Sequence, residues 1–269
     1  MKYLEFVFYD LGFIIFIFGK TKFCMKKLIS LFALLIVLTS CTFTEEITIN
    51  PDGTGKYNLD MDGSSIMAMM PKDSLKQEKN IDSVFSFKEM FEGKRDSIAK
   101  LSKEEQAKIK NLEKFNMRMK MNFDTKQFLF AMNTDFKSVA ELQEVMGSMS
   151  ELQKMNKGQA KNNPMGDMGG FGSSTAKINY EYNGKKFSRK AIVDKEALKK
   201  LESDSAAASY KMIYESSKYI IKYHFPKPVK KVSNTSALFS EDRKTITIEY
   251  SFNEYMKEPE KLNFEVVFK

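Results

Sequence analysis

The clearest pattern in the chain is a strict alternation of apolar and polar positions between residues 115 and 132. The apolar members take every second position: Phe115, Met117, Met119, Met121 and Phe123, then Phe128, Phe130 and Met132 after a turn. Successive strand residues point to opposite faces of a sheet, so this period predicts two paired strands with one apolar face. We expect the three methionines to be buried in a core, with copper(I) binding through their thioethers as the alternative.

Two further hairpins are predicted. Ile47 and Ile49 alternate with polar residues, as do Tyr57, Leu59 and Met61, and the Pro-Asp-Gly cluster between the two runs favours a turn. Asn183-Gly184 separates alternating runs at 178–182 and 185–193. A two-residue Asn-Gly turn would set Glu181 opposite Lys186 and Tyr180 opposite Phe187.

The last third of the chain alternates again, which predicts strands over 218–225, 232–239, 245–252 and 262–268. Pro226 and Pro228 cannot donate ladder hydrogen bonds, so the first of these strands must end, or lie on an edge, at Phe225. Strands this close in sequence favour an antiparallel meander.

Helical spacing appears over 97–114, where Ser102 and Glu105 form a potential capping box, over 138–155, and over 195–201. Segments 82–91 and 206–215 fit a strand or a helix equally well. Residues 157–175 are rich in Gly, Asn and Ser and predict a flexible loop. The expected fold is therefore a single α+β domain over 41–269, an antiparallel sheet of hairpins with a C-terminal meander and with helices, chiefly 97–114 and 138–155, packed on one face.

A different pattern precedes this domain. Lys26 and Lys27 are followed by a run over 28–38 that is apolar apart from Ser30, and then by Leu38-Thr39-Ser40-Cys41. A bilayer span needs about 20 apolar residues, so this run is too short and matches the central region of a secretory signal. The end of the run resembles the lipobox of bacterial lipoproteins, which implies that Cys41 is lipidated and becomes the first residue of the mature chain. The alternatives are a buried core helix, or a helical hairpin in the membrane with residues 11–18.

We interpret 25–40 as the signal peptide and 1–24 as an upstream extension from a misplaced start, with a longer first segment as the alternative. A lipidated cysteine, carrying palmitate-type acyl chains, predicts a protein of the cell envelope. We expect attachment to the outer membrane, facing the periplasm or the cell surface. Nucleic acid is not expected as a partner there.

Composition narrows the chemistry. Cys24 lies in the extension and Cys41 is consumed by lipid, so the mature chain has no thiol for a disulfide or metal site. His224 is the only histidine, which excludes two-histidine zinc sites and leaves one imidazole for a serine triad. It alternates with Tyr223 and Phe225, so we expect a structural or exposed side chain. No cofactor, metal ligand or catalytic residue is predicted.

The chain has 43 basic and 35 acidic residues, and the excess is concentrated over 185–231, with thirteen basic and five acidic residues. A solvated, charged surface is the simplest interpretation. Binding to anionic lipid head groups or to phosphates of surface polysaccharide is the alternative.

A resemblance to LppM-like bacterial lipoproteins appears at both ends of the mature chain. It covers Tyr223 to Val229, Asn234, the turn over 241–244 with the strand after it, and the Asp52-Gly53-Thr54-Gly55 hairpin that follows Cys41. The resemblance implies an envelope-facing α+β domain with lipid binding as a candidate activity. It supplies no catalytic residues.

Two classes of function remain. The first is a non-enzymatic, membrane-anchored lipoprotein that binds a lipid or other hydrophobic ligand, or acts as a scaffold for an envelope protein. The second is an envelope hydrolase that uses carboxylates or a Ser-Lys pair. We favour the first, with any ligand entering between the sheet and its helices at the methionine-rich strand face, although the ligand-binding residues are not identified.

Overall fold

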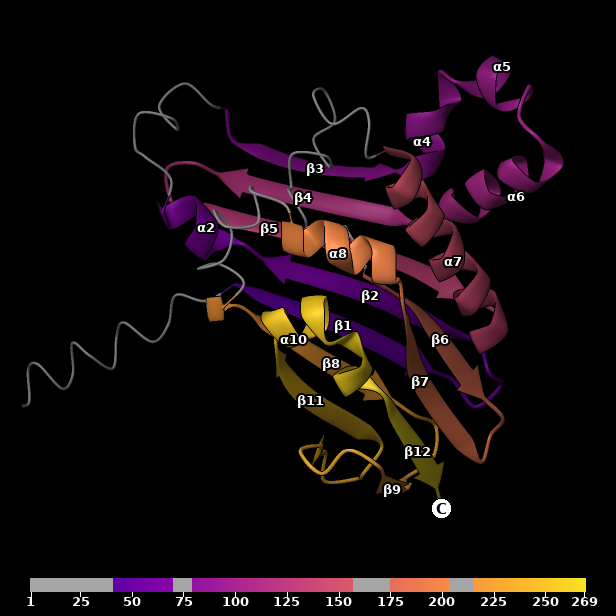
Figure 1. Cartoon of the computed structure of the whole chain (residues 1–269), viewed down its shortest axis with the longest axis vertical. Helices are drawn as coiled ribbons and strands as arrows, with labels where there is room; N and C mark the ends of the chain where they lie inside the picture. Colours follow the sequence, from indigo (N-terminus) through magenta and orange to yellow (C-terminus); the bar gives the residue numbers. More distant parts are fainter. Residues whose placement is uncertain (1–40, 70–78, 157–174, 204–214) are drawn as a thin grey trace, which may run out of the picture. The chain divides into compact units, whose positions relative to one another are not determined.

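The computed structural model describes residues 41–69, 79–156, 175–203 and 215–269. The chain divides into two compact units, of which the second, Cys41–Lys269, contains every element described here. Its strands are β1 (Thr42–Ile49), β2 (Gly55–Asp62), β3 (Ile81–Ser86), β4 (Asn116–Asn122), β5 (Gln127–Phe136), β6 (Ala176–Tyr182), β7 (Lys186–Val193), β8 (Lys218–His224), β9 (Val229–Val232), β10 (Leu238–Phe239), β11 (Thr245–Ser251) and β12 (Phe264–Phe268). The helices are α2 (Ser64–Met69), α4 (Phe87–Glu92), α5 (Arg95–Ile98), α6 (Lys103–Leu112), α7 (Val139–Asn156), α8 (Lys195–Ser203), α10 (Phe252–Lys257) and the 3-10 turn η2 (Pro259–Leu262) (Figure 1).

The strands form two sheets. The larger has eight strands in the order β10-β11-β8-β1-β2-β5-β4-β3, and the smaller has four in the order β6-β7-β12-β9. All described pairings are antiparallel except that of β1 with β8. Two parallel neighbours need a crossover connection, and here the chain from β2 to α8, which includes the smaller sheet's β6 and β7, connects β1 with β8.

The inner faces of the two sheets pack on each other through aromatic side chains. β1 and β8 bury every second residue, and Ile47, Ile221 and Tyr223 are fully buried. Across the interface the ring of Phe187 lies 5.5 Å from that of Tyr223, and Phe225 lies 4.9 Å from Phe268. In β1 and β8, every second residue of the sequence alternation therefore faces this two-layer core, and the residues between them face away from it.

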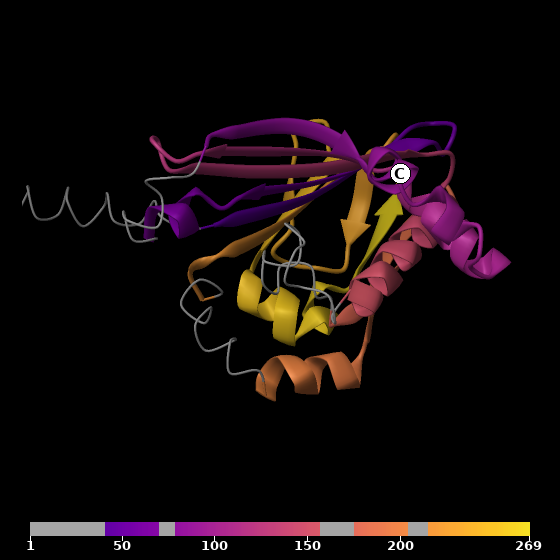
Figure 2. The ribbon, with the colours of Figure 1, turned by 90° about the horizontal axis from the view of Figure 1, so that it is seen from above.

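Helices α7, α8 and α10 lie on the same side of the eight-stranded sheet as the smaller sheet (Figure 2). α7 contacts β6, β5 and α6, and its residues Leu142, Val145 and Met149 are buried. The expected α+β class with helices on one face is confirmed. The helices are not the main cover of the large sheet, however, because the second sheet takes that place.

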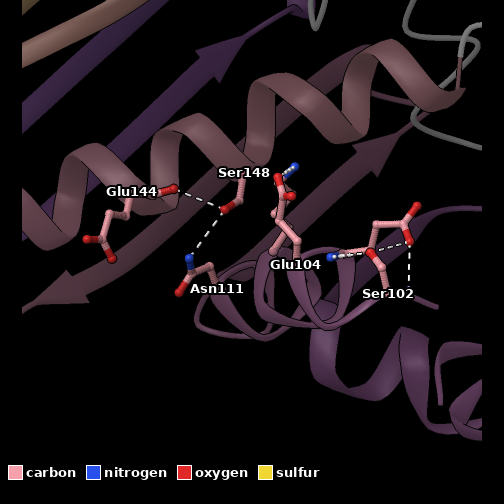
Figure 3. A network of polar contacts seen from close by, with 7 residues as sticks. Ser102, Glu104, Asn111, Glu144 and Ser148 are labelled. Atoms are coloured by element: carbon pink, nitrogen blue, oxygen red, sulfur yellow. Dashed lines mark hydrogen bonds and ion pairs between the residues drawn. The ribbon is translucent and has the colours of Figure 1, made fainter.

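The helical region before β4 is divided in two. The sequence predicts one helix over 97–114, but α5 ends at Ile98 and α6 starts at Lys103. The predicted capping box is confirmed: Ser102 accepts a hydrogen bond from the Glu105 backbone, and Glu105 bonds back to the backbone of Ser102. A side chain that caps a helix start cannot lie inside a continuous helix, and this is why the longer helix does not form. Asn111 of α6 then donates to Ser148 of α7 (Figure 3).

The ambiguous segment 82–91 is both strand and helix. β3 ends at Ser86, which caps α4 with a second Ser/Glu box formed with Glu89. The alternation and the helical spacing therefore belong to adjacent elements.

The predicted C-terminal meander is wrong in its pairing. β8 and β11 are neighbours in the large sheet, whereas β9 and β12 pair in the small one. The strand expected over 232–239 is replaced by β9 and the two-residue β10, and the strand expected from Leu262 starts at Phe264 because η2 occupies Pro259–Leu262. Alternation predicts a strand and which of its faces is buried, but it does not predict which other strand it pairs with.

The hairpin of β6 and β7 forms two residues away from the predicted register. Tyr182 pairs with Phe187, Tyr180 with Arg189 and Glu181 with Ser188. Asn183 closes the turn by donating its N–H to the Lys186 carbonyl at 3.1 Å, which leaves Gly184 and Lys185 as the central pair. Gly184 has φ +77°, and a positive φ at the first central position is the signature of a II′ turn.

Several predictions lie outside the described residues. These are the extension 1–24, the signal peptide 25–40, nearly all of the loop 157–175 and most of segment 206–215. Within the described ranges, no helix is long and apolar enough to span a bilayer.

Candidate functional site

Cys41, the predicted lipidation site, lies at the start of the large sheet. Its carbonyl accepts a 2.9 Å hydrogen bond from the Lys218 backbone, and β1 begins at the next residue. Its sulfur lies 2.9 Å from the Ser65 hydroxyl on α2, and the side chain is 1% exposed. Cys41 is therefore joined directly to the sheet, with no intervening residues.

The three methionines of β4 share the inner face but differ in burial. Met117 is fully buried, as predicted. Met119 and Met121 are only half-buried, so the prediction that all three are buried is wrong for these two. Burial therefore falls along β4, from Phe115 and Met117 in the core toward the turn that leads into β5.

The half-buried residues at this end of the sheet form what we term the apolar strip: Ile81, Phe85, Met119, Met121 and Phe128. Met121 pairs with Ile81 on one side and Phe128 on the other, and Met119 lies between Ser83 and Phe130. Ser83 on the same face is exposed, so the strip opens toward the β3 edge. Methionine adapts its shape easily, which suits such a face to flexible apolar ligands.

The strip has a helix at each end. At one end Gly63, which leads into α2, donates its N–H to the Phe128 carbonyl at 2.9 Å, and the Phe128 N–H donates to Ser64. A Cβ on Gly63 would lie 2.7 Å from the Phe128 ring, so only glycine permits this approach. At the other end α4 follows β3 directly.

A buried polar cluster occupies the space between the two sheets near β1. Glu45 of β1 accepts hydrogen bonds from Tyr180 at 2.8 Å and from Tyr219 and Tyr223, and Arg189 of β7 donates to it at 3.3 Å. Arg189 also donates to the Leu262 carbonyl at 3.2 Å. Both charged side chains are at most 3% exposed. A buried ion pair is tolerable because its oxygens and most of its N–H groups are satisfied.

Burial acts on the pKa of each group in this cluster. Desolvation tends to raise the pKa of Glu45, but Arg189 and the hydroxyls of Tyr219 and Tyr223 together outweigh it, so the net pKa is lowered and the carboxylate stays charged. Desolvation and the Glu45 charge raise the pKa of Tyr255, whose ring stacks on Tyr219, to about 12. The tyrosines are therefore neutral hydrogen-bond donors.

The cluster was not predicted from the sequence, although a signal was present. Glu45 stands between Phe43 and Ile47, and Arg189 between Phe187 and Ala191, so each is a charge at an inward-facing strand position. Glu45 is the one carboxylate that the described residues place in this network, so it does not provide the paired carboxylates of a glycosidase. Glu45 of the large sheet is hydrogen-bonded to Arg189 and Tyr180 of the small sheet, so it links the two sheets.

His224 lies on the outer face of the large sheet. Its Nε2 is 2.6 Å from a Glu46 oxygen and its Nδ1 is 2.9 Å from the Thr245 hydroxyl. The order hydroxyl, imidazole, carboxylate is that of a catalytic triad. β8 pairs on both sides, with β1 and β11, so the strand N–H groups around His224 serve the ladders and are not directed at a developing oxyanion.

Most of the described basic residues of 185–231 lie on β7, α8, β8 and β9, and apart from the buried Arg189 they are partly or fully exposed. Several pair with surface carboxylates, such as Lys218 with Glu249 at 2.8 Å and Lys222 with Glu46 at 3.3 Å. This distribution agrees with a solvated, charged surface. Among the described residues, no group of three or more His, Cys, Asp or Glu side chains is arranged to hold a metal ion.

No protein-family model matches the chain, and no curated protein matches it. Among solved structures, the chain is similar to the NMR structure of the folded domain of LppM from Mycobacterium tuberculosis, with 10% identity and a TM-score of 0.40 over 85% of this chain and 89% of the other. This weak structural similarity is to the same family of lipoproteins that the sequence resembles.

Proposed function

We propose that the chain is a non-enzymatic envelope lipoprotein, held on the membrane by lipid on Cys41. The observation that carries the proposal is the signal pattern over 26–41, in which two lysines, a short apolar run and small residues end at a cysteine. Support comes from the compact unit, which begins at Cys41, the residue at which such a signal is removed. We further propose that the lipid anchor is in the outer membrane.

Several acyl chains on one residue hold a protein firmly. Each buried methylene contributes about 0.8 kcal/mol, so one chain gives marginal binding and two or more give stable attachment. The domain needs no further membrane-binding element to remain on the bilayer.

Cys41→Ser is expected to release the protein from the membrane or leave it unprocessed, because the hydroxyl cannot replace the thiol as acceptor of the lipid. Fractionation of cells into membrane and soluble parts, with and without detergent, measures this. Cys24→Ser is the matched control and should remain in the membrane fraction at the processed size. A wild-type protein that is soluble without detergent would contradict the proposal.

Within this role we infer that the apolar strip receives a lipid or another hydrophobic ligand. Its residues are half-buried and uncharged, and α2 places one end of the strip beside Cys41. The space around Glu45 is less suitable for an apolar ligand, since the buried ion pair and tyrosines occupy it. A scaffold that presents the strip to an envelope protein is the competing role.

Met119→Lys is expected to remove a lipid that co-purifies with the wild-type protein, because a lysine in the strip would put a charge against acyl chains. Mass spectrometry of organic extracts from protein purified in its native state measures the lipid. Met119→Leu conserves volume and apolar character and should retain it. A wild-type protein without lipid would favour the scaffold role.

A further inference from the structure

We propose that α2 is the surface on which the anchored domain rests, with its apolar side chains in contact with the phospholipid bilayer. This rests on the proposed anchor at Cys41 and adds an orientation and a contact element to it. The partner is the lipid surface itself, where head groups meet acyl chains.

The first observation is the lack of a spacer. The Cys41 carbonyl is already bonded to Lys218, and Thr42 is paired with Asp62 and with Lys218. A strand held on both sides cannot extend away from its sheet without breaking these bonds. Lipid on Cys41 therefore brings this end of the sheet to the membrane surface.

The second observation is the position of α2 against the sulfur. The Ser65 hydroxyl lies 2.9 Å from Cys41 Sγ, and the cysteine is 1% exposed. A diacylglyceryl group on that sulfur needs a path outward, and among the described residues α2 supplies the hydrogen-bonding contact to the sulfur. The acyl chains therefore leave the domain along α2.

The third observation is the chemistry of the helix. Its sequence, Ser-Ser-Ile-Met-Ala-Met, has no charged residue. Met67 is buried and Ile66 packs against the core, whereas Ala68 and Met69 are exposed, Met69 at 53%. An exposed methionine on an uncharged helix is costly in water and suited to the lipid interface.

The fourth observation is that α2 is fixed to the sheet and carries a cation at its end. The Lys126 ammonium, from the β4–β5 turn, donates to the Ala68 carbonyl at 3.1 Å, and Ser64 bonds to Phe128. The helix therefore moves with the domain. Lys126 lies where lipid phosphates would meet the edge of an inserted helix.

The test uses the full chain, purified from membranes and reconstituted into phosphatidylethanolamine/phosphatidylglycerol vesicles. Processing removes Cys24 and lipid consumes Cys41, so Met69→Cys introduces the one reactive thiol for an environment-sensitive fluorophore. Ala68→Cys is a second probe on the same helix. Lys56→Cys is the matched control, because Lys56 is exposed at the opposite end of β2, six residues and roughly 20 Å from Asp62.

Brominated lipids in the bilayer should quench the probes at 68 and 69 several-fold more than the probe at 56. Equal quenching at all three sites, in protein that floats with the vesicles, would overturn the proposal and leave the lipid anchor standing. A blue-shifted probe at 69 without quenching by lipid would show a protein partner or a second copy there, and would also overturn it. A processed protein that does not float would contradict the anchor itself.

Discussion

Arg189→Met should lower the free energy of unfolding by about 3–5 kcal/mol, the usual cost of removing one partner from a buried ion pair. The substitution leaves the Glu45 carboxylate, 3% exposed, with tyrosine hydroxyls but no cation. Urea denaturation of the purified protein, followed by circular dichroism, measures the loss. Lys190→Met is the matched control: Lys190 is the next residue on β7, its side chain is 56% exposed, and its contact with Glu265 is 3.9 Å long. This control should change stability little.

The double variant Glu45→Gln with Arg189→Met removes both charges and should lose less than the sum of the single variants. Additive losses would show that the two side chains do not act as a pair.

Acidification tests the same pair. The folded-state pKa of Glu45 is lowered below its ordinary value of 4.5, by Arg189 and the tyrosine hydroxyls acting against desolvation. A lowered carboxylate pKa stabilises the fold at pH values above the unfolded pKa, and this stability is lost as the pH falls through the folded value. Below about pH 4.5 the wild-type protein should therefore lose stability more steeply than the double variant.

Met117→Ala should also be costly, by about 2–5 kcal/mol, because it opens a cavity at a fully buried position between Phe85 and Met132. Met119→Ala, two residues on, should cost clearly less, since that side chain is only half-buried and water can enter the space left behind. Thermal unfolding of the two variants compares them. Met117→Leu is the volume-conserving control and should cost less than about 1.5 kcal/mol.

This pair of methionines separates the core from the proposed ligand strip. If alanine were equally destabilising at both positions, Met119 would belong to the packed core and the strip would not be available to a ligand.

The sequence predicts the strands and their faces well. β1, β2, β4, β5, β7, β8 and β11 lie where alternation places them, because period two records burial on one face directly. The helix over 138–155 and the capping box at Ser102 are also confirmed, since each depends on residues only three or four positions apart.

Long-range features could not be predicted. The division of the C-terminal strands between two sheets depends on which surfaces meet, and alternation is the same for either partner. Glu45 and Arg189 are 144 residues apart, so their inward positions signal that each needs a partner without identifying it. The predicted register of the β6–β7 hairpin was wrong for a local reason. Both Asn183-Gly184 and Gly184-Lys185 are plausible central pairs of a turn with a positive-φ glycine, and the structure has the second.

The most direct test of the central claim is the mass of the mature N-terminal peptide. Trypsin cleaves after Lys56, and no lysine or arginine lies between Cys41 and that residue, so the peptide 41–56 carries the whole modification. We predict that it starts at Cys41 and has the added mass of a diacylglyceryl thioether, with or without an amide-linked acyl chain. A peptide that starts at Leu28, or one with an unmodified Cys41 thiol, would contradict the account.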